Sequence, residues 1–301
     1  MTTIQQVHWK LEMDYIGHPY YVSGNAICHA LGHRLPSAVR QTLRASHGMF
    51  VPGQYGTFPD EHSQSGSHPA FGTSCREVAA YQDLFVFREP FQPWLIDSRP
   101  RDALNTHDCR LQSGHPALAH QTTINLPDTH RWNYRTTNWF VSSYLSATNE
   151  SVLPLETDVL DNVQFGGKRN YGYGTAQLVD TQVIDLDEIE YASLRNADEF
   201  ILKLTTPFVL ESSYPSADDI EIPWWWAESR DDLGERTEKI VEQREVYRLT
   251  TVDHGQVVEY CGDRPVETAK NGICRIGTHS KYGFGEFRVI PVDRTSSEQA
   301  A

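Results

Sequence analysis

The sequence has few lysines, no paired cysteine motif and no long apolar run. Only 6 of its 26 basic residues are lysine. Its five cysteines are an odd number with no Cys-x-x-Cys pair, so neither a disulfide framework nor a zinc ribbon is indicated. No apolar run approaches the length of a membrane span, and the polar residues 1–6 do not resemble a signal peptide. We therefore expect reduced thiols, a cytoplasmic location and no membrane partner.

The formal net charge of −14 is unevenly spread along the chain. Residues 1–150 carry 12 acidic and 11 basic side chains, whereas residues 151–301 carry 28 and 15. Such acidity is not typical of a nucleic-acid-binding protein, because neutralisation of phosphates supplies most non-specific affinity. The acids gather in 180–190, 218–221 and 231–238, however, away from the motif described next. Local charge at that motif therefore matters more than the total.

One segment of the sequence occurs twice. Residues 154–179 and 265–290 align without a gap at an offset of 111 residues. Each copy begins with Pro, an aliphatic residue, Glu and Thr, and each contains Gly-x5-Gly-aromatic-Gly followed by a strand-like tail. A helix, a glycine loop and a strand made twice by a chain of 301 residues predict two related domains.

Hydrophobic periodicity predicts the elements of the first half. Alternation over residues 7–15 predicts a half-buried strand, and helical spacing follows over 25–31 and 38–45 with an interruption at Pro36. The stretch 48–130 is rich in Gly, Pro, Ser and His, which is typical of an irregular insertion with a few strands. An apolar run then leads to the first copy of the repeat.

The second half predicts a similar order of elements. A new strand starts at 200–204, residues 245–260 predict a hairpin turning at 253–255, residues 265–272 a short helix and 286–291 the last strand. Strand, helix, hairpin, helix and strand is the ferredoxin-like order. We therefore expect an α+β fold of two tandem ferredoxin-like βαββαβ domains, each ending in a glycine loop and a strand. The expected domains are residues 1–197, with the insertion at 48–130, and residues 198–301.

The two glycine loops are the candidate binding sites. Glycine takes positive φ easily, so such a loop can present backbone N–H groups to an anion, while basic and aromatic side chains bind phosphates and bases. Neither loop has the signature of a dinucleotide or P-loop site, and we expect an RNA ligand. The predicted RNA-binding residues are Gly166, Gly167, Lys168, Arg169, Tyr171, Gly172 and Gly174 in the first copy, and Gly277, His279, Lys281, Tyr282, Gly283 and Gly285 in the second. A purely structural explanation is that the glycines let helix and strand pack closely.

The two loops resemble those of a known family. Phe165 to Gly174 reads FGGKRNYGYG and Ile276 to Gly285 reads IGTHSKYGFG. With their flanking helices they are similar to the RAMP superfamily of CRISPR-associated proteins, which have duplicated ferredoxin-like domains. The resemblance implies loops that contact guide RNA (crRNA), partners among other CRISPR effector subunits, and no cofactor. The Gly-Gly-Lys-Arg form midway along the chain is most like the type III effector subunits that bind the crRNA 5′ handle.

An enzymatic alternative stays open at this point. Processing endoribonucleases of the same superfamily cut RNA without a metal, often through a histidine near the first helix, and the candidates here are His29, His33 and His47. Because 11 of the 13 histidines lie in residues 1–150, histidines near this helix are also expected from composition. A zinc site from His29, His33 and a cysteine, or from His107 and Cys109, has no established spacing behind it, so we expect no metal. The third alternative is a ferredoxin-like protein unrelated to RNA.

Overall fold

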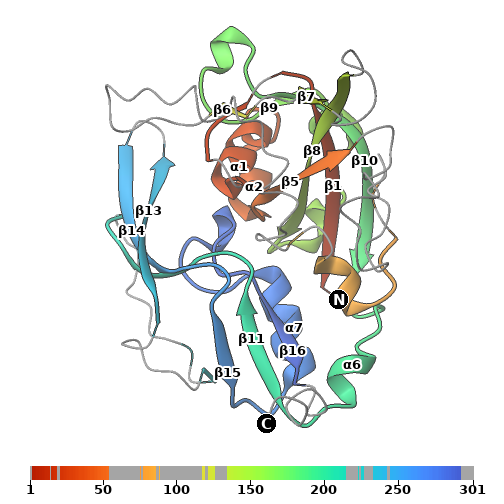
Figure 1. The fold of residues 1–301 in the computed structure, drawn as a ribbon, viewed down its shortest axis with the longest axis vertical. Coiled ribbons are helices and arrows are strands. Elements are labelled where there is room, and N and C mark those ends of the chain that lie inside the picture. Colours follow the sequence, from red (N-terminus) through yellow and green to blue (C-terminus); the bar gives the residue numbers. More distant parts are fainter. Residues whose placement is uncertain are drawn as a thin grey trace.

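The protein is described from a computed structural model, which covers residues 2–13, 15–18, 21–53, 75, 77–85, 88, 117–118, 121–125, 134–214, 223, 225–226, 233–242 and 245–292. Over these ranges the chain forms an α+β fold of mostly antiparallel strands with short helices, which confirms the α+β part of the expectation (Figure 1). No helix in these ranges is long and apolar enough to cross a membrane.

The larger sheet has eight strands and is centred on β1 (Thr3–Leu11). β8 (Tyr134–Ala147) and β10 (Thr175–Asp185) pair with β1 on its two sides, both antiparallel. The other strands of this sheet are β3 (Tyr21–Val22), β4 (Leu43–Ala45), β5 (Gly48–Gly53), β7 (Gln121–Asn125) and β9 (Val163–Gln164). Separately, β2 (Tyr15–Ile16) pairs with β6 (Ala117–Leu118).

The helices α1 (Gly24–Gly32) and α2 (Ser37–Thr42) cover one face of this sheet. Ser23 caps α1 by accepting a hydrogen bond from the Ala26 backbone N–H, and Pro36 separates the two helices, as predicted. The apolar side chains of β1 on this face pack against the helices, and the Trp9 indole donates to the Leu160 carbonyl at 2.7 Å. That carbonyl belongs to the short helix α5 (Thr157–Leu160), which precedes the first glycine loop.

The prediction that β1 is half-buried is wrong, because its second face is also covered. Gln6 and His8, which alternate with the apolar residues, are 2% and 1% exposed. Neighbouring side chains cover both: the Gln6 amide donates to the Tyr144 hydroxyl at 3.3 Å, and the His8 ring stacks on Phe140. Strict alternation identified the strand, but a polar face can be buried where its groups find partners.

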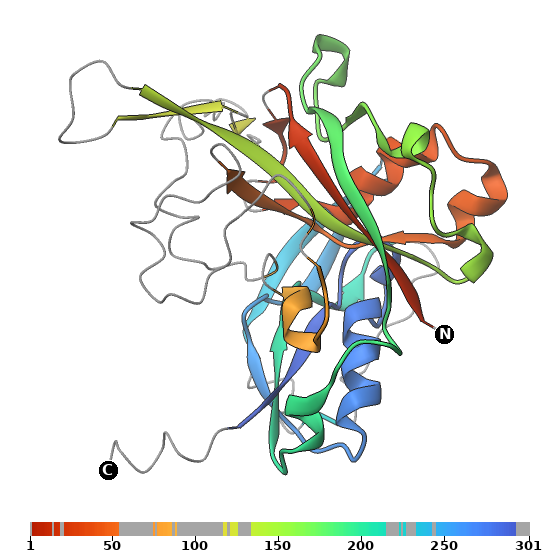
Figure 2. The same ribbon diagram turned by 90° about the vertical axis from the view of Figure 1, so that its right-hand side faces the viewer.

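The smaller, C-terminal sheet has the strand order β15 (Val257–Tyr260), β11 (Phe200–Leu204) and β16 (Phe287–Pro291), all antiparallel. The helix α7 (Pro265–Cys274) packs against it through Ala269 and Ile273, with the short helix α6 (Ala192–Arg195) beside it (Figure 2). The predicted strand at 200–204, helix at 265–272 and strand at 286–291 therefore exist.

A third sheet replaces part of the expected ferredoxin-like order in the second half. It contains β12 (Phe208–Ser212), β14 (Glu245–Val252) and β13 (Glu235–Glu242), and no helix occurs among the described residues between β11 and β15. The predicted hairpin at 245–260 is wrong, since β14 pairs with β13 and β15 pairs with β11. Local alternation revealed both strands, but strand partners are set by contacts distant in sequence.

The stretch 48–130 is more closely integrated than the sequence suggests. Its first residues form β5 and pair with β8, and a 3₁₀ turn at Tyr81–Phe85 packs into the core of the C-terminal sheet. The Tyr81 hydroxyl accepts a hydrogen bond from the Val289 backbone N–H at 2.9 Å, and the turn lies beside this sheet in Figure 2. This segment of the first half of the chain therefore attaches the C-terminal sheet to the N-terminal half.

A buried ion pair completes this attachment. Arg88 donates from Nε to Glu286 at 2.9 Å and from a terminal nitrogen to the other carboxylate oxygen, and it also donates to the His47 carbonyl. The side chains are 0% and 4% exposed. Because Arg88 follows the 3₁₀ turn, His47 precedes β5 and Glu286 precedes β16, the pair joins both sheets.

We predict that Arg88→Met lowers the free energy of unfolding by about 3–5 kcal/mol, because it leaves the Glu286 carboxylate buried without its partner. Urea denaturation measures this. The matched control is Arg236→Met, whose partner Glu238 lies at 3.6 Å and whose own side chain is 42% exposed; it should cost less than about 1 kcal/mol. Equal losses for the two variants would contradict the role given to Arg88.

Candidate nucleic-acid interface

The two glycine loops have the same backbone shape, residue for residue. The first loop (165–174) and the second loop (276–285) take positive φ at equivalent positions. Gly166, Lys168, Gly172 and Gly174 have φ of 77°, 53°, 83° and 70°, and Gly277, His279, Gly283 and Gly285 have 85°, 62°, 100° and 77°. Each loop also contains a 3₁₀ turn, at Arg169–Tyr171 and Ser280–Tyr282. The sequence repeat is therefore a structural repeat.

The same hydrogen bonds close both loops. Phe165 N–H donates to the Gly174 carbonyl at 2.9 Å, and its equivalent Ile276 N–H donates to the Gly285 carbonyl at 3.1 Å. A Cβ on Gly174 or Gly285 would stand about 2 Å from the carbonyl oxygen of Phe165 or Ile276, respectively. Glycine is thus required where the two ends of each loop meet.

A side-chain brace inside each loop was not found from the sequence. Gln164 Nε2 lies 3.4 Å from the Arg169 carbonyl and 3.2 Å from the Thr175 hydroxyl. The residue 111 positions later is Arg275, whose Nε donates to the equivalent carbonyl, that of Ser280, at 3.1 Å. Glutamine and arginine do not look alike in an alignment, but both reach the same atom and hold the 3₁₀ turn in place.

The first loop presents its polar side chains to solvent. Its residues 167–171 are all exposed, and the Tyr171 ring is 78% exposed. Neither Lys168 nor Arg169 makes an ion pair with a described residue. The left-handed Lys168 precedes the right-handed 3₁₀ turn, a combination that directs successive backbone N–H groups to one side and suits an anion.

The second loop is instead packed against the N-terminal sheet and α1. A Cβ on Gly283 would stand 2.3 Å from Nδ1 of His47, whereas nothing lies within 4 Å of the same position on Gly172. A Cβ on Gly24, at the start of α1, would meet the Tyr282 carbonyl at 2.4 Å. The Lys281 ammonium lies 3.4 Å from the Gln41 carbonyl.

His279, which is the equivalent of Lys168 and also has positive φ, faces inward as well. Its Nε2 lies 2.8 Å from the Ser212 hydroxyl, and its ring contacts Tyr214 edge-on and stacks beside Tyr282. Of the predicted RNA-binding residues in the second loop, only Gly277 is exposed. The structure thus brings the predicted residues of the first loop together on the surface. It packs most of the predicted residues of the second loop against the N-terminal half of the chain.

The three histidines proposed for catalysis occupy different environments. His29 lies half-buried on α1, and His33 is exposed at its end. His47 is fully buried, accepts a hydrogen bond from the Gly24 N–H at 2.9 Å and stacks on Tyr21. Burial holds the pKa of the His47 imidazole well below its usual range, aided by the positive charge of Arg88. This geometry suits a structural histidine.

No group of three or more His, Cys, Asp or Glu side chains that could hold a metal ion occurs in the ranges described. His107 and Cys109 lie outside them.

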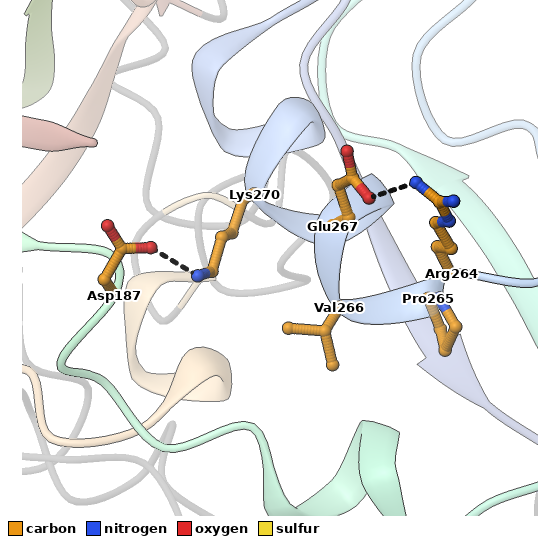
Figure 3. A pocket seen from close by; sticks show the side chains of 6 residues that line it. All are labelled: Asp187, Arg264, Pro265, Val266, Glu267 and Lys270. Atoms are coloured by element: carbon orange, nitrogen blue, oxygen red, sulfur yellow. Dashed lines mark hydrogen bonds and ion pairs between the residues drawn. The ribbon is translucent and has the colours of Figure 1, made fainter. Parts of the chain in front are cut away.

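A pocket of about 500 Å³ lies at the start of α7 (Figure 3), where Lys270 pairs with Asp187 at 2.5 Å and Arg264 with Glu267 at 3.3 Å. Both cations of this pocket are already neutralised. Trp226, the last of three consecutive tryptophans, is buried against Phe208.

No protein-family model and no curated protein matches the sequence. Among solved structures, the chain is similar to "CRISPR associated protein Cas6", at a TM-score of 0.40 and 9% identity over 97% of this chain and 100% of that one. It is also similar to a chain of "the Type III-B Cmr-beta bound to cognate target RNA", solved by cryo-electron microscopy, at a TM-score of 0.32 and 12% identity over 84% and 86%. At these TM-scores the likenesses carry no functional assignment.

The glycines Gly172 and Gly283 form a matched pair for testing the second loop's contact. Both have positive φ, so alanine costs about 1 kcal/mol in backbone strain at either. Only at Gly283 does the added methyl group collide with His47, and we predict a total loss of about 3 kcal/mol there. Urea denaturation of both variants checks this, and equal losses would show that the second loop is not tightly seated.

Acid should destabilise the protein through its buried histidines. Burial lowers the pKa of His8 to about 4, so below its ordinary value of about 6.5 the unfolded chain binds a proton that the folded one excludes. Stability from this group is complete above pH 6.5 and is lost as the pH falls toward 4. Between pH 6.5 and pH 5 the loss from His8 is about 2 kcal/mol. Urea titrations at both pH values should show a smaller decrease in the free energy of unfolding for His8→Asn than for the parent chain. Identical decreases would contradict the role given to His8.

Proposed function

We propose that this protein binds RNA through its first glycine loop, as a guide-RNA (crRNA)-binding subunit of a CRISPR ribonucleoprotein complex. The observation that carries the proposal is the difference between two loops of identical backbone shape. One is enclosed by its own chain, and the other presents to solvent an open aromatic ring and two cations that form no ion pair with a described acid. The loop is held in this conformation by Gln164, by two obligatory glycines and by a hydrogen bond from the Gly167 N–H to the Ile16 carbonyl at 2.8 Å. Its residues 168–171 remain exposed, which suits an external ligand.

The chemistry of the first loop fits a single-stranded nucleic acid. Lys168 and Arg169 can neutralise phosphates, and backbone N–H groups beside the left-handed Lys168 add further donors. The Tyr171 ring, 78% exposed, can stack on an unpaired base. Charge, hydrogen-bond donors and an aromatic surface within four residues are what such a ligand requires.

The finer assignment follows the resemblance of the loops. We assign the chain to the RAMP superfamily, with two ferredoxin-like units at residues 1–197 and 198–301, the second lacking a helix among the described residues after its first strand. In this assignment the first loop binds the crRNA 5′ handle, and other effector subunits are its partners. The topology of the N-terminal sheet supports the first unit. Its central strands lie side by side in the order β5, β8, β1 and β10, and α1 lies between β1 and β5 along the chain.

The alternative is a metal-independent endoribonuclease that matures precursor crRNA. Of its three candidate histidines, His47 is enclosed, so His29 and His33 on α1 would carry the acid–base work. α1 does lie against β9, which leads into the first loop, and Arg34 donates to the Asn162 carbonyl at 2.6 Å.

We predict that Lys168→Ala/Arg169→Ala weakens binding of labelled single-stranded RNA carrying a CRISPR repeat by about tenfold near 0.15 M salt. The reason is the loss of two phosphate contacts, which should also reduce the salt slope by about 1.4. Fluorescence anisotropy over about 50–200 mM salt measures both. The matched control is Arg264→Ala/Lys270→Ala, which removes the same charges from cations already paired with acids.

A denaturing gel of the same RNA, incubated in EDTA, separates the two functions. Intact RNA with binding lost in the loop variant supports a binding subunit. A discrete cut that disappears in His29→Ala or His33→Ala, with binding retained, supports the nuclease. Absence of binding by the parent chain, or equal binding by the loop and control variants, would overturn the proposal.

A further inference from the structure

The hairpin formed by β13 and β14 has two different faces. The two strands pair along their whole length, with Lys239 opposite Arg248 and Val241 opposite Val246. On the inner face Ile240 and Leu249 are 2% and 0% exposed and pack against Phe284 of the second loop. The inner face therefore fixes the hairpin to the rest of the molecule, beside α1 in Figure 1.

The anchoring extends to the N-terminal half of the chain. The Asn25 side chain on α1 donates to the Val241 carbonyl near the end of the hairpin. The hairpin is thus held at its base by β12 and near its tip by α1. Contacts at both ends therefore hold the hairpin in place beneath its outer face.

The outer face carries two cations directly opposite one another. Lys239 and Arg248 are both exposed, and neither makes an ion pair with a described residue. Like charges opposite each other on neighbouring strands destabilise a sheet. The acid nearest along the strand, Glu238, lies on the inner face by alternation and is close to Arg236 instead. An anion bound between Lys239 and Arg248 would relieve their repulsion.

Two apolar residues adjoin these cations. Val241 and Val246 are 50% and 59% exposed and form the next cross-strand pair on the same face. An anionic ligand with apolar parts fits this combination better than a small inorganic ion. In single-stranded RNA, phosphates alternate with riboses and bases, and a guanidinium such as that of Arg248 can also stack on a base.

We propose that the outer face of the β13–β14 hairpin is a second RNA-binding surface, with Lys239 and Arg248 on phosphates of a single strand and Val241 and Val246 against its sugars or bases. This proposal rests on the proposed function and extends it. An acidic protein cannot attract RNA by its net charge, so binding requires local groups of unpaired cations. The first loop supplies one such group, and this hairpin face supplies another.

The experiment measures binding of a labelled oligouridine, which forms no duplex, to Lys239→Ala/Arg248→Ala. We expect an affinity about tenfold lower near 0.15 M salt and a salt slope reduced by about 1.4, as for two lost phosphate contacts. Arg264→Ala/Lys270→Ala, with the same change in net charge, should bind like the parent chain. Lys239→Gln/Arg248→Gln, with longer side chains that preserve strand packing, repeats the test, and urea denaturation verifies folding.

The outcomes separate this proposal from the function on which it rests. Weaker binding by Lys168→Ala/Arg169→Ala, with unchanged binding by both hairpin variants, would overturn the second surface and leave the first loop standing. Failure of the parent chain to bind RNA would overturn both. If the hairpin variants lose binding only to polyglutamate, the face serves an acidic polypeptide and the RNA proposal for it is wrong.

Discussion

The contact between the second glycine loop and the N-terminal half is the constraint on which the rest of the structure depends. Gly283 lies so close to His47 that no side chain fits between them, and His47 in turn accepts a hydrogen bond from the first residue of α1. The Arg88–Glu286 pair, immediately beside this loop, attaches the same region to the turn at 81–85. Because these groups are buried, each half of the chain satisfies polar groups of the other.

This contact also explains why two copies of one loop have different roles. Both copies need positive φ at the same four positions, and both have a side chain that braces the 3₁₀ turn. The surroundings decide the rest: His47 and α1 occupy the space around the second loop, and the equivalent space around Gly172 is open. The first loop has the same shape and contacts the chain through Gly166 and Gly167, but its residues 168–171 stay exposed.

The repeat could be read from the sequence because it depends on local chemistry. Glycines at positions that require positive φ, with an aromatic residue and cations at fixed spacing, identify both loops and the strands that follow. The seating of the second loop could not be predicted, since it depends on His47, which lies more than 200 residues away in sequence. The brace was also hidden, because Gln164 and Arg275 are chemically different residues with one geometric role. The pairing of β14 with β13 instead of β15 was not predictable either, because alternation identifies strands but not their partners.

The two exposed cationic groups would allow an acidic chain to bind the polyanionic ligand proposed for it. Net charge governs long-range attraction, but contacts at the surface depend on unpaired local cations. The pocket at the start of α7 shows the contrast, because its lysine and arginine are both neutralised by neighbouring acids. In the proposed function the first loop is one RNA-binding site and the hairpin face is a second, with the second loop as the structural link between the two halves.

The most direct test of this account is photochemical cross-linking of the protein to single-stranded RNA, followed by mass spectrometry of the cross-linked peptides. Tyr171 and Tyr282 occupy the same position in the two loops, so each is the internal control for the other. The account predicts cross-links at Tyr171 and none at Tyr282. Cross-links at Tyr282, or none within residues 165–174 when RNA is bound, would contradict it.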